Sequence, residues 1–364
     1  MSKNLPNARG FFNLVNVYPE GLRIAGWMFH PQIAMDSFKV FIDGQLQLEQ
    51  PLVENTAVAD TFPFVAHALK SEFNVLLPYD KKLGLLDIVV VGCVAGVETA
   101  KITTWFSENI NTDYPFPDNL KTRVANNTNI HFFRASSFTS FRNYYEQVQR
   151  FAKPGSLKNM LDWGCGCGRI SVMFENATDI KAVYGGDIDG ESIAWCKENL
   201  KGQYDVTPLF PPTKYADNFF ELVISNAVFT HLTKDVQQQW LAEMQRIVAP
   251  GGLFIASVHG EFATFFNFNG EVEETLTNDI NDSTIDKSLA GVVPDGYYRG
   301  THQKKTYTEQ VFSQYFEILD YIEAGAGNFQ DLVVMKKAAT KGFVNTLSQP
   351  KSPSRFKKSS KRKK

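Results

Sequence analysis

The segment MLDWGCGCGRI, residues 160–170, decides how the second half of this 364-residue chain folds. Its apolar start predicts a strand that ends near Asp162, and Gly164, Gly166 and Gly168 then precede a predicted helix. Glycines let a backbone turn tightly and approach a ligand without obstruction by a Cβ atom. The segment therefore predicts a ligand-binding loop between a strand and a helix.

The loop departs from the pattern that binds nicotinamide dinucleotides. That pattern, G-x-G-x-x-G, requires its third glycine where this chain has Arg169. The carboxylate of Asp162, two residues before the first glycine, is unfavourable beside a pyrophosphate but suits a cationic amino-acid group. The strand, the acid and the glycines together resemble the first motif of the class I S-adenosylmethionine-dependent methyltransferases.

Predicted strands and helices alternate along the rest of this region. Strands are expected at 157–163, 181–187, 220–226, 252–258, 316–322 and 331–337, and helices at 169–176, 191–200, 235–248 and 307–316. Such alternation favours a parallel sheet with helices on both faces and a ligand at the carboxyl ends of its strands. The resemblance implies an α/β, Rossmann-like domain with a mostly parallel seven-stranded sheet. A polar, acidic insertion at 261–296 interrupts the alternation, as lids, substrate-contacting segments and disordered loops do.

A second acid supports the resemblance. The next predicted strand ends in VYGGDID, which places Asp187 at the position where a carboxylate can accept hydrogen bonds from both ribose hydroxyls. In the family this acid has that role. Asp187 could instead cap the helix that begins near Glu191, but Asp189 is better placed as the cap.

Further segments extend the resemblance to the later motifs of the family. PLFPPTKYADNFFELVISNAVFTHL, residues 208–232, implies that Leu209 to Pro212 border the adenine and that the next strand ends near the sulfonium. RIVAPGGLFIASVHG, residues 246–260, resembles the region that follows. The cofactor is thus expected to be S-adenosyl-L-methionine. The residues expected to contact it are Asp162, Gly164, Cys165, Gly166, Gly168, Arg169, Asp187, Ile188, Ser225 and Asn226.

Two neighbouring cysteines raise the alternative of a metal site. Cys165 and Cys167 form a C-x-C pattern, but no second pair of Cys or His follows at a suitable spacing. We therefore expect no metal, and we expect both thiols to fill small spaces in the loop.

A catalytic base is expected only if the acceptor is a hydroxyl. Methyl transfer is an in-line displacement, so the protein mainly holds the acceptor and the methyl group collinear in a dry pocket. A hydroxyl acceptor must also lose its proton, and histidine is the usual base. His231 follows the strand that ends at Ser225 and Asn226, so it is our first choice, with His259 second.

The first third of the chain has a different pattern. Between Gly10 and Phe106, short alternating apolar runs are separated by turn residues, which predicts an all-β sandwich or barrel with a chain reversal at Asp43-Gly44. This part resembles β-sandwich modules attached to bacterial glycan-modifying enzymes. We expect four parts: a β-rich accessory domain at 1–106, a linker at 107–134, the methyltransferase domain at 135–337 and a basic, disordered tail at 338–364.

Charge and composition limit the partners. The net charge is −2, yet the last fourteen residues carry eight Lys or Arg and no acid, so the remainder carries −10. An acidic body argues against a broad nucleic-acid surface. The tail is predicted to be a solubilising end, with docking to anionic lipid, RNA or a nuclear import receptor as alternatives. The sequence shows no membrane-spanning stretch and no signal peptide, and its four cysteines fit a reducing compartment, so we expect a cytoplasmic protein.

These observations predict an S-adenosylmethionine-dependent methyltransferase that O-methylates a sugar, a glycan or another small hydroxylated acceptor. The resemblance of the β-rich part and of the closing segments, residues 302–312 and 327–337, to methyltransferases of bacterial surface-glycan synthesis favours the sugar. One alternative is a protein or RNA methyltransferase guided by the basic tail. Another is a non-catalytic S-adenosylmethionine-binding scaffold whose β-rich domain holds a protein partner.

Overall fold

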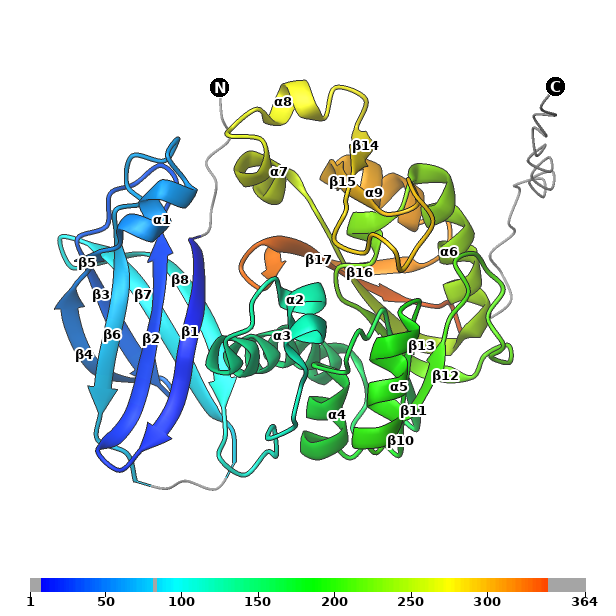
Figure 1. Cartoon of the computed structure of the whole chain (residues 1–364), viewed down its shortest axis with the longest axis horizontal. Coiled ribbons are helices and arrows are strands. Elements are labelled where there is room, and N and C mark those ends of the chain that lie inside the picture. Colours follow the sequence, from blue (N-terminus) through cyan, green and yellow to red (C-terminus); the bar gives the residue numbers. More distant parts are fainter. Residues whose placement is uncertain (1–7, 81–83, 340–364) are drawn as a thin grey trace, which may run out of the picture.

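The computed structural model describes residues 8–80 and 84–339, which form a β-rich part and an α/β part (Figure 1). The basic tail that was predicted to be disordered lies, from residue 340 onward, outside the described residues. Within the described ranges, no helix is long and apolar enough to cross a membrane.

The β-rich part consists of two four-stranded antiparallel sheets that pack face to face. The first contains, in order, β1 (Arg9–Tyr18), β2 (Gly21–Phe29), β6 (Lys70–Leu77) and β5 (Val53–Glu54), and the second β4 (Gln45–Pro51), β3 (Ser37–Ile42), β7 (Leu86–Val94) and β8 (Val97–Phe106). Phe73 of the first sheet meets Phe38 of the second with ring centroids 5.8 Å apart. Short helix α1 (Thr56–Thr61) covers one end. The predicted β-rich, sandwich-like architecture is confirmed.

The predicted chain reversal at Asp43-Gly44 joins β3 to β4. Asp43 has φ 50° and Gly44 has φ 76°. Two consecutive positive φ values are the signature of the tight hairpin turns that match the twist of the flanking strands.

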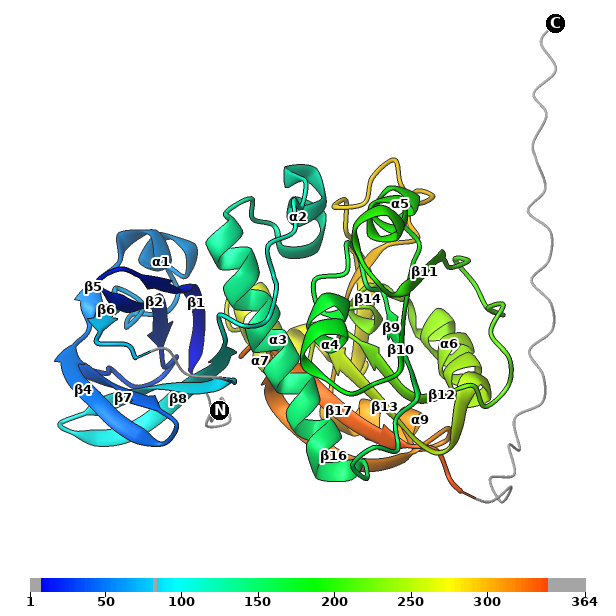
Figure 2. The same cartoon turned by 90° about the horizontal axis from the view of Figure 1, so that it is seen from below.

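One long helix connects the two parts (Figure 2). Helix α3 (Ile130–Phe151) begins at Ile130, because Asn129 caps it by accepting a hydrogen bond from the His131 backbone N–H at 2.9 Å. Short helix α2 (Asp118–Ala125) precedes it, so much of the expected linker is helical. On one side, Phe141 of α3 packs on Trp105 of β8 with ring centroids 5.7 Å apart, and on the other it packs on Phe174 at 5.1 Å.

The α/β part is built on a seven-stranded sheet. Its strand order is β11 (Gln203–Val206), β10 (Ala182–Asp187), β9 (Asn159–Trp163), β12 (Phe220–Ser225), β13 (Val248–Val258), β17 (Gln330–Lys336) and β16 (Glu317–Ala326). Strand β17 runs antiparallel to both of its neighbours, and the other pairings are parallel. The main helices that alternate with its strands are α4 (Ser171–Ala177), α5 (Gly190–Asn199), α6 (Lys234–Ile247) and α9 (Lys305–Phe312). The predicted Rossmann-like, mostly parallel sheet is confirmed.

The acidic insertion has structure of its own. It contains α7 (Glu261–Asn267), α8 (Val272–Thr275) and β14 (Ile280–Ile285), and β14 pairs antiparallel with β15 (Arg299–Gln303). Phe266 of α7 meets Phe29 and Phe62 of the β-rich part, with ring centroids 6.0 Å and 5.6 Å apart. The insertion therefore forms a second apolar contact between the two parts, in addition to α3.

Candidate cofactor pocket and catalytic base

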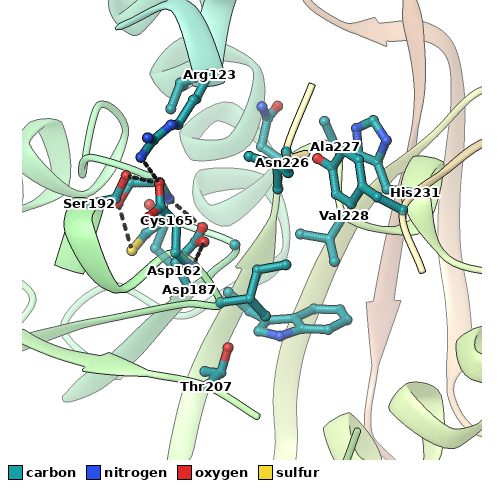
Figure 3. Close-up of a pocket in the computed structure, with 18 of the residues that line it drawn as sticks. Arg123, Asp162, Cys165, Asp187, Ser192, Thr207, Asn226, Ala227, Val228 and His231 are labelled. Atoms are coloured by element: carbon teal, nitrogen blue, oxygen red, sulfur yellow. Dashed lines mark hydrogen bonds and ion pairs between the residues drawn. The ribbon is translucent and has the colours of Figure 1, made fainter. Parts of the chain in front are cut away.

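A pocket lies at the carboxyl ends of β9, β10 and β12, where parallel α/β sheets bind their ligands. Asp162 and Asp187 lie on one side of it, and Asn226 and His231 lie on the other (Figure 3). Helix α2 and the insertion also contribute residues to the wall.

The glycine loop needs its glycines for conformation and for space. Gly164 and Gly166 both line the pocket and have φ 80° and 53°, which side-chain-bearing residues rarely adopt. A Cβ atom on Gly166 would lie 2.6 Å from Val124 Cγ2 of α2. Gly168, also predicted to contact the cofactor, is not in the wall, because it packs against Leu200 and the Cys196 thiol.

Asp187 is held with its carboxylate toward the loop. Its Oδ2 accepts a hydrogen bond from the Gly166 backbone N–H at 2.7 Å, and its Oδ1 accepts one from the Asp189 N–H at 2.8 Å. Burial raises the pKa of Asp187. Asp189 is the cap of α5, as predicted, because its Oδ1 accepts from the Glu191 N–H at 3.1 Å. Each carboxylate oxygen of Asp187 keeps a second lone pair, and Asp187 lines the pocket, so its carboxylate can still accept hydrogen bonds from a ligand.

Asp162 has one carboxylate oxygen without a partner. Its Oδ2 accepts a hydrogen bond from the Ser171 hydroxyl at 2.6 Å, whereas its buried Oδ1 has no hydrogen-bond partner among the described residues. Burial raises the pKa of Asp162 to about 6. An unpaired buried carboxylate oxygen is costly unless a donor reaches it. Since Asp162 lines the pocket, it fits the ammonium group at the amino-acid end of S-adenosylmethionine.

Arg169 also lines the pocket beside this carboxylate. Its Nη1 donates a hydrogen bond to the Ser136 hydroxyl of α3 at 2.8 Å, and its buried Nε has no partner among the described residues. Burial lowers the pKa of Arg169, although it stays protonated at neutral pH. A guanidinium in this position suits a ligand carboxylate.

His231 faces the same pocket from the single-turn helix η1 (Phe229–His231). Its Nδ1 lies 2.8 Å from the Arg299 carbonyl oxygen and 3.5 Å from Asp286 Oδ2. Its ring stacks on Tyr298, with centroids 3.9 Å apart. Because a carbonyl only accepts, Nδ1 carries the proton and Nε2 keeps its lone pair. Burial lowers the pKa of His231, so the ring is neutral at neutral pH.

The remaining predicted residues divide between the wall and its support. Cys165, Ile188 and Asn226 line the pocket, whereas Ser225 does not: its carbonyl accepts a hydrogen bond from the Tyr144 hydroxyl at 2.9 Å behind the wall. His259, the second predicted base, lies outside the wall, where it stacks on His302 with ring centroids 4.5 Å apart.

Several wall residues were not predicted. They include Arg123 and Val124 from α2, Thr207 after β11, and Leu289, Tyr297 and Tyr298 from the insertion and the residues after it. Thr207, rather than the expected Leu209–Pro212, reaches the pocket from the segment after β11. Tyr297 connects the two segments, because its hydroxyl donates a hydrogen bond to the Leu209 carbonyl at 2.5 Å.

The cysteines of the loop are buried thiols. Burial raises the pKa of Cys167 to about 12 and that of Cys165 well above its usual value, so both are protonated at neutral pH. Among the described residues, no group of three or more His, Cys, Asp or Glu side chains is arranged to hold a metal ion.

Comparison with known proteins identifies the domain. A family model described as a methyltransferase domain matches residues 161–256, which include the glycine loop, Asp187 and His231. A solved S-adenosylmethionine-dependent methyltransferase from Methanosarcina mazei has a TM-score of 0.41 and 16% identity, covering 54% of this chain and 99% of its own. N-methyltransferase NodS from Bradyrhizobium japonicum, solved with S-adenosyl-L-homocysteine, has a TM-score of 0.36 and 14% identity. The match covers 54% of this chain and 86% of NodS. The chain therefore contains a methyltransferase domain, whose matched residues lie on the seven-stranded sheet behind the β-rich region.

Proposed function

We propose that the protein transfers the methyl group of S-adenosylmethionine to a hydroxyl oxygen of a sugar, a glycan or another small hydroxylated acceptor, with His231 as the general base. The observation that carries this proposal is the orientation of His231. Its Nδ1 is occupied by the Arg299 carbonyl, so the basic Nε2 remains for an acceptor at the pocket wall.

Each end of the cofactor has matching residues in the proposed site. The unpaired Oδ1 of Asp162 binds the ammonium group, Arg169 binds the carboxylate, and the carboxylate of Asp187 accepts from the ribose hydroxyls. Asn226 lies at the end of β12, on the side of the pocket where His231 faces. When bound, S-adenosylmethionine supplies the activated methyl group.

The surroundings of His231 suit proton removal. Burial keeps the imidazole neutral, which is the form that accepts a proton. Asp286, 3.5 Å from Nδ1, stabilises the imidazolium that forms when the acceptor gives up its proton. Stacking on Tyr298 fixes the plane of the ring. His259 lies outside the wall, which favours His231 as the base.

The choice of a sugar or glycan rests on resemblance. The fold requires only a small-molecule or macromolecular acceptor. The β-rich part and the closing segments, residues 302–312 and 327–337, resemble methyltransferases of bacterial surface-glycan synthesis. This analogy is the reason to begin an acceptor screen with sugars.

The test is turnover with a panel of sugars and nucleotide sugars, followed as formation of S-adenosylhomocysteine. His231→Gln should lower turnover by about 100-fold or more, the usual contribution of a general base. Its affinity for S-adenosylhomocysteine should stay within about twofold of the native value, because binding does not need the base. His67→Gln, a matched change in the β-rich part, should leave both unchanged. Native turnover in His231→Gln would refute the role of His231.

A further inference from the structure

Buried hydrogen-bond donors without acceptors gather around Phe329, outside the cofactor pocket. They are Nε and Nη1 of Arg9, Nδ1 of His259 and Nδ2 of Asn328, and none has a partner among the described residues. A buried donor left unpaired costs roughly 1–3 kcal/mol, so several together call for an explanation.

Arg9 begins β1 in the β-rich part and is only 7% exposed. Its guanidinium carbon lies 4.0 Å from the centre of the Phe329 ring and 4.4 Å from that of Phe11. No described carboxylate forms an ion pair with it, and burial lowers the pKa of Arg9 to about 9. The phenyl rings offset part of the desolvation cost, but the N–H groups still lack acceptors.

His259 also presents a donor, because its neighbours fix the position of its proton. The Ala227 backbone N–H donates to the Ser257 hydroxyl at 2.8 Å, so that hydroxyl donates to Gln330 Oε1 at 2.7 Å. The amide nitrogen of Gln330 therefore faces His259 Nε2, 3.3 Å away, and Nε2 is the acceptor. The ring is protonated at Nδ1, the atom without a partner.

The two donors border the same ring. The His259 ring centroid lies 5.6 Å from that of Phe329, on which Arg9 stacks. Burial is the main cause that lowers the pKa of His259, and His302, the nearby His231 and Arg9 lower it further, whereas a contact with the Thr301 backbone opposes the shift. His259 as a residue is half-buried, whereas its Nδ1 atom is enclosed. Ala227 lines the cofactor pocket and is linked through Ser257 and Gln330 to His259, so the donors extend from that wall to the first strand of the β-rich part.

We propose that Arg9 and His259 bind an anionic oxygen group of the acceptor, a carboxylate or a phosphate, so that the acceptor is a negatively charged hydroxylated compound such as a uronic acid or a sugar phosphate. This inference rests on the proposed function. A group rich in acceptors satisfies a set of donors, and a guanidinium binds carboxylate and phosphate in a planar fork. The β-rich part then has a defined role, since it supplies Arg9 to the acceptor site.

The test measures anion binding without turnover. The native chain, saturated with S-adenosylhomocysteine, is titrated with acetate and with inorganic phosphate at constant ionic strength, and then with glucose, glucuronate and glucose 1-phosphate. One of the two small anions should bind, and the corresponding charged sugar should bind at least tenfold more tightly than glucose. Which pair responds identifies carboxylate or phosphate as the source of the charge.

Two variants locate the site. Arg9→Met keeps an unbranched side chain but removes the donors, and His259→Phe keeps the ring stack but removes the Nδ1–H. Each should lower anion affinity at least tenfold, while Arg23→Met, at an exposed position of β2, keeps native affinity. If Arg9→Met does not fold, His259→Phe and the titration of the native chain still test whether the anion site exists.

Three outcomes would overturn the anion site: neither small anion binding the native chain, glucose binding as tightly as the charged sugars, or both variants keeping native anion affinity. Failure of the proposed function looks different, because it appears as no turnover of any hydroxylated acceptor while S-adenosylhomocysteine and the anion still bind.

Discussion

Replacing Asp162 by Asn isolates the group that we assign to the ammonium of the cofactor. The substitution keeps the size of the side chain and an oxygen for the Ser171 hydroxyl, 2.6 Å from Oδ2 in the native chain. It removes the negative charge and replaces the unpaired carboxylate oxygen by an amide NH2 group. That group is a donor and cannot accept a hydrogen bond from an ammonium. A hydrogen bond to a charged group contributes about 1.5–3 kcal/mol, so affinity for S-adenosylhomocysteine should fall about 10- to 100-fold.

The pH dependence of binding gives a second signature. The pKa of Asp162 is about 6, and only the ionised form pairs with the ammonium. Between pH 7.5 and pH 5, the ionised fraction falls to about one-tenth, so native affinity should fall about tenfold. Asp162→Asn should lack this dependence over the same range.

Stability measurements separate lost binding from lost folding. The folded-state pKa of Asp162 lies above its ordinary value, so the folded chain holds the proton more tightly than the unfolded chain. Ionisation of Asp162 therefore lowers stability as pH rises from about 4 through 6, and Asp162→Asn removes that loss. At pH 7.5 the ligand-free variant should have a Tm at or above the native Tm.

The assay is calorimetric titration with S-adenosylhomocysteine at both pH values, together with thermal melts. Asp217→Asn, which changes an exposed, ion-paired carboxylate, is the matched control and should behave as the native chain does. An Asp162→Asn variant with native affinity at pH 7.5 would refute the assignment.

Three further substitutions test the loop, the second acid and the contact between the two parts. Gly166→Val places a branched side chain at φ 53° against Val124. Calorimetry should therefore show at least a tenfold loss of S-adenosylhomocysteine affinity, about 1.4 kcal/mol. Native affinity would contradict the role of the glycine loop in binding. Asp187→Ala should cost at least as much, and an unchanged dissociation constant would exclude its contact with the ribose. Phe266→Ala should lower the free energy of unfolding in urea by about 3 kcal/mol, because this buried ring packs on Phe29; a change below 1 kcal/mol would show that the contact adds little.

The loop and its acids were predictable because their signals are local. A strand, an acid and spaced glycines occur within eleven residues, and the structure places Asp162, Gly164 and Gly166 together in the pocket wall. Asp189 was predictable as a cap because capping depends on the residues that follow at once.

The wall residues from elsewhere were not predictable, since their positions depend on tertiary contacts. Tyr297 and Tyr298 follow an acidic insertion without a motif, and they reach the pocket only because β15 pairs with β14 and Tyr297 bonds the Leu209 carbonyl. Arg123 comes from α2, inside a segment whose Asn, Asp and Pro content indicated a linker. One signal was present there, because Asn129 is a favourable cap and aromatic residues follow it.

Alternation within a strand limited the prediction for Ser225. The residue at the end of β12 was expected beside the sulfonium, but its side chain is fully buried and the next residue, Asn226, lines the pocket. Neighbouring residues of a strand point to opposite faces, so a shift of one position exchanges a ligand contact for a core contact.

The most direct test of the account is the identity of the atom that receives the methyl group. The native chain is incubated with S-adenosylmethionine carrying a ¹³C-labelled methyl group and with the panel of neutral and charged sugars, and the products are examined by NMR. We predict a labelled methyl on a hydroxyl oxygen, formed by the native chain and lost in His231→Gln. A labelled methyl on nitrogen or carbon, or an equal yield of the O-methyl product from His231→Gln, would contradict the account.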